Sequence, residues 1–178
     1  IFVDDLDSII LKKIKKINKK KVLFIIISKS GNTLETITNI NLLTFFNFNE
    51  KNTIIITEAK NNALNNFAKK KKILIIKHRT YISGRYSVLS EVGMVPAYFM
   101  GLDLKKFRKN LLKNIDGYNR KILSESVINL AKNYQSKKIN IIVFFNYSSK
   151  LNDLALWCQQ LIAESLGKKS KGILPILS

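Results

Sequence analysis

Short apolar runs alternate with amphipathic segments along most of the chain. Four runs rich in isoleucine and valine predict strands over 22–27, 52–57, 73–76 and 139–145, and a shorter run over 1–3 predicts the end of another. The intervening segments repeat apolar residues at helical spacing and predict helices over 7–19, 33–46, 58–70, 87–100, 103–115, 118–134 and 150–163. This alternation predicts an α/β fold of three layers, α/β/α, with a mainly parallel five-stranded sheet covered on both faces and joined by right-handed crossovers.

A short polar loop, residues 28–33 with the sequence SKSGNT, lies between the strand predicted over 22–27 and the next helix. Ligands of parallel sheets bind beyond the carboxyl ends of the strands, where this loop lies. The backbone N–H groups and the dipole of the following helix favour a negative charge, and the hydroxyls and the amine can complete a phosphate site. The glycine spacing is neither that of a P-loop nor that of a dinucleotide-binding loop.

Length and composition limit the class of protein. The 178 residues predict a single domain region over 1–178, and the chain begins and stops in mid-pattern, as a fragment incomplete at both ends would. No apolar run reaches the roughly 18–20 residues that span a bilayer, so no membrane partner is expected. The single cysteine, Cys158, excludes an internal disulfide and favours a reducing compartment such as the cytoplasm.

The formal net charge of +19, from 31 Lys and Arg against 12 Asp and Glu, raises the question of nucleic-acid binding. Most of this charge is lysine, in a chain equally rich in isoleucine and asparagine, which indicates a general compositional bias. In the segment over 9–17, Ile10, Ile14 and Ile17 share one helical face and the lysines take the other. We therefore expect solvated lysine faces and no nucleic-acid partner, although the charge would attract an anionic substrate.

The helix predicted over 150–163 carries two kinds of residue on opposite sides. Its apolar stripe, predicted to be buried, consists of Leu151, Leu154, Ala155, Cys158, Leu161 and Ile162. Trp157, Gln160 and Glu164 lie on the other side, one turn apart, and lead into residues 167–172. The glutamine and the glutamate either line a ligand pocket or face solvent. Cys158 lies on the apolar stripe and is expected to serve packing.

A third segment, residues 84–87 with the sequence GRYS, follows the strand over 73–76. Arg85 suits the binding of an anion or an enediolate, and Gly84 permits a close backbone approach. An arginine there is equally compatible with an ordinary salt bridge. The only histidine, His78, is predicted to be a surface or loop residue, and no cluster of His, Cys and carboxylates suggests a metal site.

Three blocks, IIISKSGNTLETIT, SGRYSVLSEVG and WCQQLIAESLGKKSKGILP, resemble the glucose-6-phosphate isomerase family in the same order and over nearly the whole chain. The first block alone would indicate the wider group of sugar-isomerase (SIS) domains, and the other two single out this branch. The resemblance implies a flavodoxin-like, doubly wound SIS domain. It also implies a homodimer that binds a sugar phosphate, and a reaction that needs no cofactor and no metal.

The resemblance also assigns roles to individual residues. Those matching the phosphate-binding loop are Ser28, Lys29, Ser30 and Thr33, with Gly31 and Asn32 supplying backbone. Arg85 matches the arginine that stabilises the enediolate, Gln160 a substrate-contacting glutamine, and Glu164 the general base. A glutamate is ionised near pH 7 and can move a proton between C2 and C1 through a cis-enediol, which is how glucose 6-phosphate and fructose 6-phosphate interconvert.

The resemblance is incomplete at both ends. A Gly-Ser segment of the phosphate site would precede Ile1, and the ring-opening histidine and a late lysine would follow Ser178. His78 does not match the catalytic position. We therefore expect the chain alone to bind a phosphosugar weakly and to turn over little. Two alternatives stay open: a non-catalytic phosphosugar-binding SIS module and a basic nucleic-acid binder.

Overall fold

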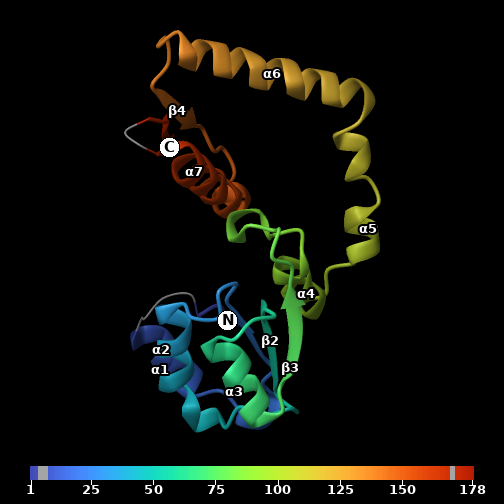
Figure 1. Cartoon of the computed structure of the whole chain (residues 1–178), viewed down its shortest axis with the longest axis vertical. Helices are drawn as coiled ribbons and strands as arrows, with labels where there is room; N and C mark the ends of the chain where they lie inside the picture. The colour runs from blue at the N-terminus through green and yellow to red at the C-terminus, as the bar shows by residue number, and fades with distance from the viewer. Residues whose placement is uncertain (4–7, 169–170) are drawn as a thin grey trace. The chain divides into compact units, whose positions relative to one another are not determined.

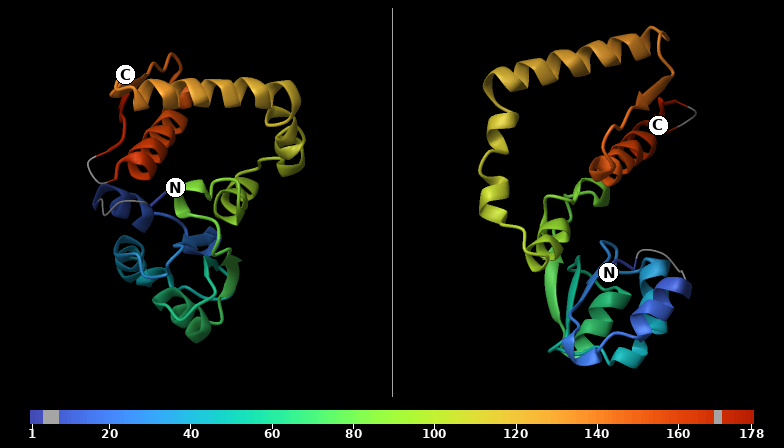
Figure 2. Two further views of the ribbon diagram at one scale, coloured as in Figure 1. Left: turned by 45° about the horizontal axis from the view of Figure 1, so that its top comes forward. Right: turned by 180° about the vertical axis from the view of Figure 1, so that it is seen from behind.

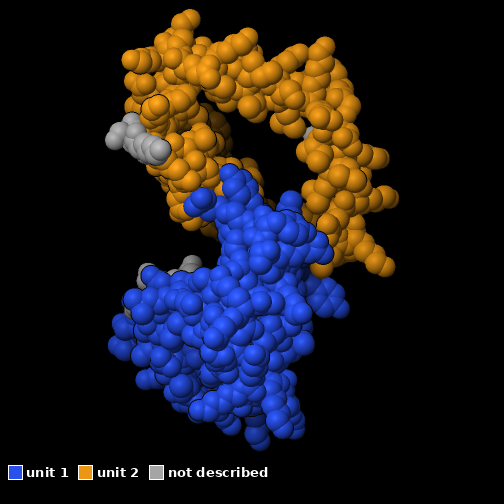
Figure 3. Space-filling view, in the orientation of Figure 1, with its two compact units in different colours: residues 1–102 blue, residues 103–178 orange. Residues whose placement is uncertain are grey.

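The structure is a computed structural model and describes residues 1–3, 8–168 and 171–178. Contacts divide the chain into two compact units, residues 1–102 and 103–178, coloured separately in Figure 3. Each unit is described by itself. The single domain region expected over 1–178 stays a prediction.

Unit 1 is built on a three-stranded parallel sheet in the order β1 (Phe24–Ile27), β2 (Thr53–Glu58) and β3 (Leu74–His78). Ile26, Ile55 and Ile75 lie side by side in register across the three strands. All three belong to the core or pack against it, because alternate residues of a strand share one face of the sheet. The fully buried side chain of Ile55 stabilises the unit by about 1.5–3 kcal/mol.

The helices of unit 1 follow the strands in alternation. Their bounds are α1 (Ser8–Lys15), η1 (Lys19–Lys21), α2 (Leu34–Leu42), η2 (Thr44–Phe46), α3 (Ala63–Lys71), η3 (Gly84–Tyr86) and α4 (Glu91–Phe99). Figure 1 shows α1, α2 and α3 on the same side of the sheet, and the core joins them to β2 through Ile14, Ile40 and Leu64. On the other face Leu74 is 58% exposed, so the described residues do not cover both faces fully.

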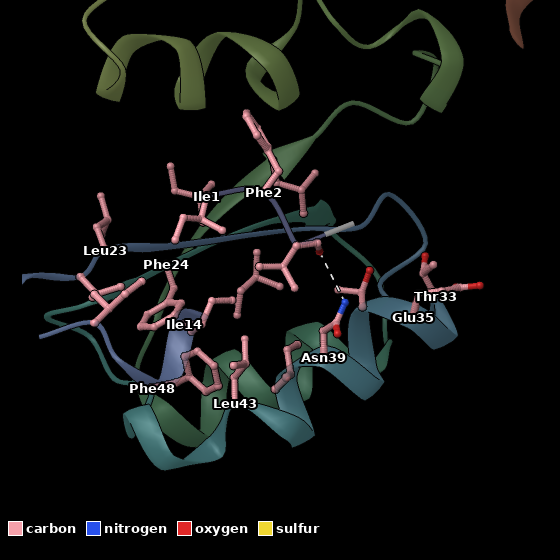
Figure 4. Close-up of a pocket in the computed structure, with 18 residues that line it drawn as sticks. Ile1, Phe2, Ile14, Leu23, Phe24, Thr33, Glu35, Asn39, Leu43 and Phe48 are labelled. Carbon is pink, nitrogen blue, oxygen red and sulfur yellow. Dashed lines mark hydrogen bonds between the residues drawn. The ribbon is translucent and has the colours of Figure 1, made fainter. Parts of the chain in front are cut away.

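An apolar groove of about 730 Å³ runs along β1, one of the two edge strands of this sheet. Figure 4 shows Ile1 and Phe2 on one side of the groove, and Asn39 of α2 and its C-cap residue Leu43 on the other. Residues 1–3 line it without forming the strand that we predicted there.

Unit 2 has a two-stranded parallel sheet, β4 (Ile141–Phe144) with β5 (Leu174–Leu177). Its helices are α5 (Leu104–Arg108), η4 (Leu112–Asn114), α6 (Gly117–Gln135), η5 (Ser149–Leu151) and α7 (Asn152–Leu166). Figure 2 shows α7 (red) and α6 (orange) from two further sides. Gln159 Nε2 on α7 donates to the carbonyl of Pro175 in β5 at 3.1 Å, which fastens the helix to this sheet.

The α/β class and the parallel strand pairing are confirmed, and several predicted boundaries are wrong. A single five-stranded sheet is not confirmed, because the described residues form one sheet of three strands and one of two. The helix predicted from residue 58 begins at Ala63, since Asn62 accepts the backbone N–H of Asn65 and caps α3. The helix predicted over 103–115 divides into α5 and η4. Residue 7, where the first helix was predicted to begin, lies outside the described residues.

The strand β5 was not predicted, and it contains Pro175, a residue type that is disfavoured in strands. Proline lacks the backbone N–H and is tolerated only at a sheet edge. The sheet has two strands in the part of the chain that the structure describes, so β5 is such an edge.

Candidate functional site

The loop of residues 28–33 is held closed by its own hydroxyl groups. Ser28 is buried at the carboxyl end of β1, and its Oγ lies 2.6 Å from Thr33 Oγ1. The same Ser28 Oγ accepts the backbone N–H of Gly31 at 3.2 Å, and Ser30 Oγ accepts that of Asn32 at 3.1 Å. The predicted outward-pointing N–H groups of Gly31 and Asn32 are therefore already bonded within the loop.

The N-terminus of α2 offers the free donors of this loop. Thr33 is the N-cap residue, yet its side chain makes no capping hydrogen bond and faces Ser28. The backbone N–H groups of the first helical turn have no partner within a helix, and here the cap side chain does not supply one. Ser30 and Thr33 are exposed beside them. Hydroxyls next to an uncapped helix start can bind an anion such as a phosphate group.

A second loop, between β2 and α3, fixes the shape of the first. Gly31 has φ +69°, and a Cβ there would collide with the side-chain amide of Asn62, so glycine is required by both conformation and space. Asn32 Oδ1 accepts the backbone N–H of Ala63 at 2.9 Å. Asn65 Nδ2 donates to the carbonyls of Glu58 and Lys60, both at 2.8 Å. These amides keep the loop of residues 28–33 in one conformation.

Lys29 extends toward the segment that follows β3. Its Nζ donates to the carbonyl of Ile82 at 2.8 Å and to that of Thr80 at 3.3 Å, and lies 3.5 Å from Glu58 Oε1. The hydrogen bond from Lys60 holds the pKa of Glu58 below its ordinary value, with a smaller contribution from the charge of Lys29, against the opposing effect of burial. The predicted phosphate-contacting lysine thus joins two loops at the same edge of the sheet.

Arg85 lies on η3, half-buried, and Gly84 faces open space at the position where a Cβ would be. The prediction for His78 is wrong. It is 2% exposed at the end of β3, and its Nδ1 lies 2.8 Å from Glu91 Oε1. A carboxylate thirteen residues away in the sequence allows this polar ring to be buried, because it supplies a hydrogen-bond partner.

In unit 2, Gln160 Nε2 donates to Glu164 Oε1 at 2.9 Å on the exposed side of α7, and Trp157 is half-buried. Gln160 and Glu164 are therefore one turn apart, as predicted, and they are also in contact with each other. The buried stripe is only partly confirmed. Ala155 is buried and Cys158 half-buried, while the residues at the amino-terminal end of the stripe are about half exposed: Leu151 at 49% and Leu154 at 50%. Residues 169–170 of the predicted segment over 167–172 lie outside the described residues.

The structure brings the loop of residues 28–33 and the segment of Arg85 to the carboxyl end of one sheet, with Lys29 in contact with both loops. Gln160 and Glu164 belong to the other unit. Sequence reasoning missed Asn62 and Glu91. Asn62 could have been found as an N-cap signal before a helix. Nothing in the sequence around Glu91 indicates that it contacts His78.

Within the described residues, no three His, Cys, Asp or Glu side chains come together as a metal site requires. No described helix combines the length and the apolar character that a membrane crossing demands.

The fold and this loop define the class: a parallel α/β protein with a polar loop, suited to an anion, at the carboxyl end of its sheet. The profile of the phosphoglucose isomerase family matches residues 1–172, and the chain therefore belongs to that family.

Individual relatives agree with this assignment. Glucose-6-phosphate isomerase of Methanocaldococcus jannaschii is 33% identical over 99% of this chain and 46% of the relative. The same enzyme of Mycoplasmopsis synoviae is 33% identical over 93% of this chain and 41% of the relative. The chain thus spans less than half the length of these relatives. The crystal structure of a hypothetical protein from Thermus thermophilus has the same fold, with a TM-score of 0.85 and 24% identity, over 100% of this chain and 46% of that one.

Proposed function

We propose that the protein containing this chain is an isomerase that interconverts glucose 6-phosphate and fructose 6-phosphate. Membership of the phosphoglucose isomerase family and relatives bearing that enzyme's name support the proposal. The observation that carries it is the uncapped start of α2 beside the hydroxyls of Ser28, Ser30 and Thr33. This arrangement has the donors that a phosphate monoester requires.

The phosphate group anchors the substrate away from the reacting carbons. In the proposed site Ser30, Thr33 and the first turn of α2 bind the phosphate oxygens, and Ser28 keeps Thr33 in place. Lys29 contributes positive charge while it holds the neighbouring loop. Binding energy from the phosphate then orients the sugar and reduces the entropic cost of the proton transfer.

The proton transfer is assigned to Glu164. Its carboxylate removes the proton from C2 of the aldose and delivers it to C1, through a cis-enediol, so one group serves as base and then as acid. Arg85 stabilises negative charge on the oxygens of C1 and C2, which a permanently charged guanidinium does well. Gln160 contacts the substrate and donates to Glu164, which fixes the orientation of that carboxylate. The proposed step needs neither a metal nor a cofactor.

The wider setting is also a proposal: a cytoplasmic enzyme of glycolysis and gluconeogenesis that acts as a homodimer, with this chain as a single SIS-type region. The regions of the relatives outside this chain would supply the rest of the site. A non-catalytic phosphosugar-binding module is the alternative, since such a module would use the loop of residues 28–33 and would have no need of Glu164.

The substitution Glu164→Gln in the full-length protein distinguishes these functions. We expect kcat for fructose 6-phosphate to fall by about 10³-fold or more, because the variant has no base, with KM changed little. Steady-state kinetics in both directions provide the measurement, and exposed Glu125→Gln on α6 is the matched control. Unchanged kcat in Glu164→Gln would refute the assignment of the base. A wild-type protein that binds the sugar phosphate without turnover would support the module.

A further inference from the structure

We infer that His78 and Glu91 form a positioning pair for the segment of residues 79–85, which carries Arg85. The inference rests on the proposed function for its effect on catalysis. The ring of His78 is in contact with acceptors on both sides: Nδ1 lies 2.8 Å from Glu91 Oε1, and Nε2 lies 3.2 Å from the carbonyl oxygen of Ile82. Each ring nitrogen therefore faces a group outside β3, Nδ1 on α4 and Nε2 in the segment that follows the strand.

Glu91, at the start of α4, contacts both His78 and the next residue in the chain, Arg79. One of its carboxylate oxygens, Oε1, accepts from the backbone N–H of Arg79 at 3.2 Å as well as facing His78. Burial raises the pKa of Glu91, and hydrogen bonds from its own backbone, from His78 and from Arg79 outweigh this effect and lower it. The carboxylate is thus ionised at neutral pH, and an ionised acceptor makes a stronger bond to the ring.

The pair shares its carbonyl with the phosphate loop. The carbonyl oxygen of Ile82 accepts a hydrogen bond from Lys29 Nζ at 2.8 Å and also lies next to His78 Nε2. The segment between His78 and Arg85 is therefore fastened from two directions, by β3 and α4 on one side and by the loop of residues 28–33 on the other. A displacement of Ile82 would move the start of η3, where Ser83 precedes Gly84 and Arg85.

The pH dependence of the pair involves a small set of neighbouring groups. Glu91 faces the ring from α4, and Arg79 lies next to it in the chain. Lys29 donates to the shared carbonyl and pairs with Glu58, and Glu58 also pairs with Lys60. As the pH falls through the lowered pKa of Glu91, protonation of its carboxylate removes the negative partner of the pair.

The test compares Glu91→Ala, Glu91→Gln and Asp103→Ala in the full-length protein. Glu91→Ala should lower kcat about 10-fold while KM for fructose 6-phosphate changes less than about 2-fold, because Arg85 is misplaced and the phosphate donors of the α2 start are intact. Glu91→Gln should recover part of the loss, since its amide oxygen still accepts both bonds. Asp103→Ala is the matched control, because it also removes an acidic side chain at a helix start, that of α5.

Hydrogen exchange by mass spectrometry gives a readout that does not depend on activity. Glu91→Ala should raise amide exchange within residues 79–86 by about 10-fold or more relative to Asp103→Ala. Equal exchange in this segment, or a kcat equal to that of the control, would overturn the inference. A wild-type protein without isomerase activity would refute the proposed function alone, and the exchange comparison would still decide on the pair.

Discussion

Glu58 is the buried carboxylate that connects the lysines of the site. It is 6% exposed at the end of β2 and forms ion pairs with Lys29 and Lys60. An isolated buried charge is strongly unfavourable, so its burial depends on these two partners. Its backbone carbonyl also accepts from Asn65, which ties the same residue to the loop before α3.

The lowered pKa of Glu58 predicts that the protein loses stability in acid. The carboxyl binds a proton more weakly in the folded state than in the unfolded state, so its contribution is present above the ordinary glutamate value and is lost as the pH falls through the lower, folded pKa. The midpoint of urea unfolding, followed by circular dichroism between about pH 7 and pH 3, should show this loss. Glu58→Gln and Lys60→Met should each flatten the pH dependence, because each removes one partner. A wild-type slope in both variants would contradict the prediction.

At the level of elements, the contact between two loops determines the geometry of the proposed phosphate site. The β1–α2 loop and the β2–α3 loop are joined by the bond from Ala63 to Asn32 and by the close approach of Gly31 to Asn62. A parallel sheet places these loops at one edge, since both follow carboxyl ends of neighbouring strands.

Gly31→Ala tests this contact. We expect a loss of about 2–4 kcal/mol in the free energy of unfolding and a large loss of phosphosugar binding, because a Cβ both disfavours positive φ and collides with Asn62. Gly117→Ala is the control, since Gly117 has φ +58° and a Cβ there meets nothing within 4 Å. Thermal unfolding and isothermal titration with fructose 6-phosphate would measure both effects. Equal losses in the two variants would show that Asn62 is not the cause.

Elements with a local signal were predictable, and those decided by distant partners were not. The six apolar residues over 22–27 identify β1 without any knowledge of the rest, and the polar loop after them marks the proposed anion site. β5 was missed, and its proline is acceptable only at a sheet edge, which is a property of the whole sheet. His78 was misplaced because its carboxylate partner is on another element.

At the scale of the whole molecule, the charge of +19 is spread over several elements. The amphipathic interpretation of the first helix is confirmed, because Ile14 on α1 is buried while Lys12 and Lys13 are exposed. Further exposed lysines occur in η1 and in the last turn of α3, where positive side chains complement the helix dipole. These lysines therefore belong to solvated helix faces and helix ends.

Dispersed charge of this kind predicts nucleic-acid binding that is weak and easily suppressed by salt. Binding of a labelled duplex of about 20 base pairs, measured by fluorescence anisotropy, should be detectable near 0.05 M KCl and absent at about 0.15 M, because few phosphates are neutralised together. Binding of fructose 6-phosphate should fall much less over the same range, since one dianionic group is held by oriented hydroxyl and backbone donors in addition to charge. Submicromolar duplex binding at about 0.15 M would instead show that the lysines form a nucleic-acid surface, and the proposal of a sugar-phosphate enzyme would then have to account for it.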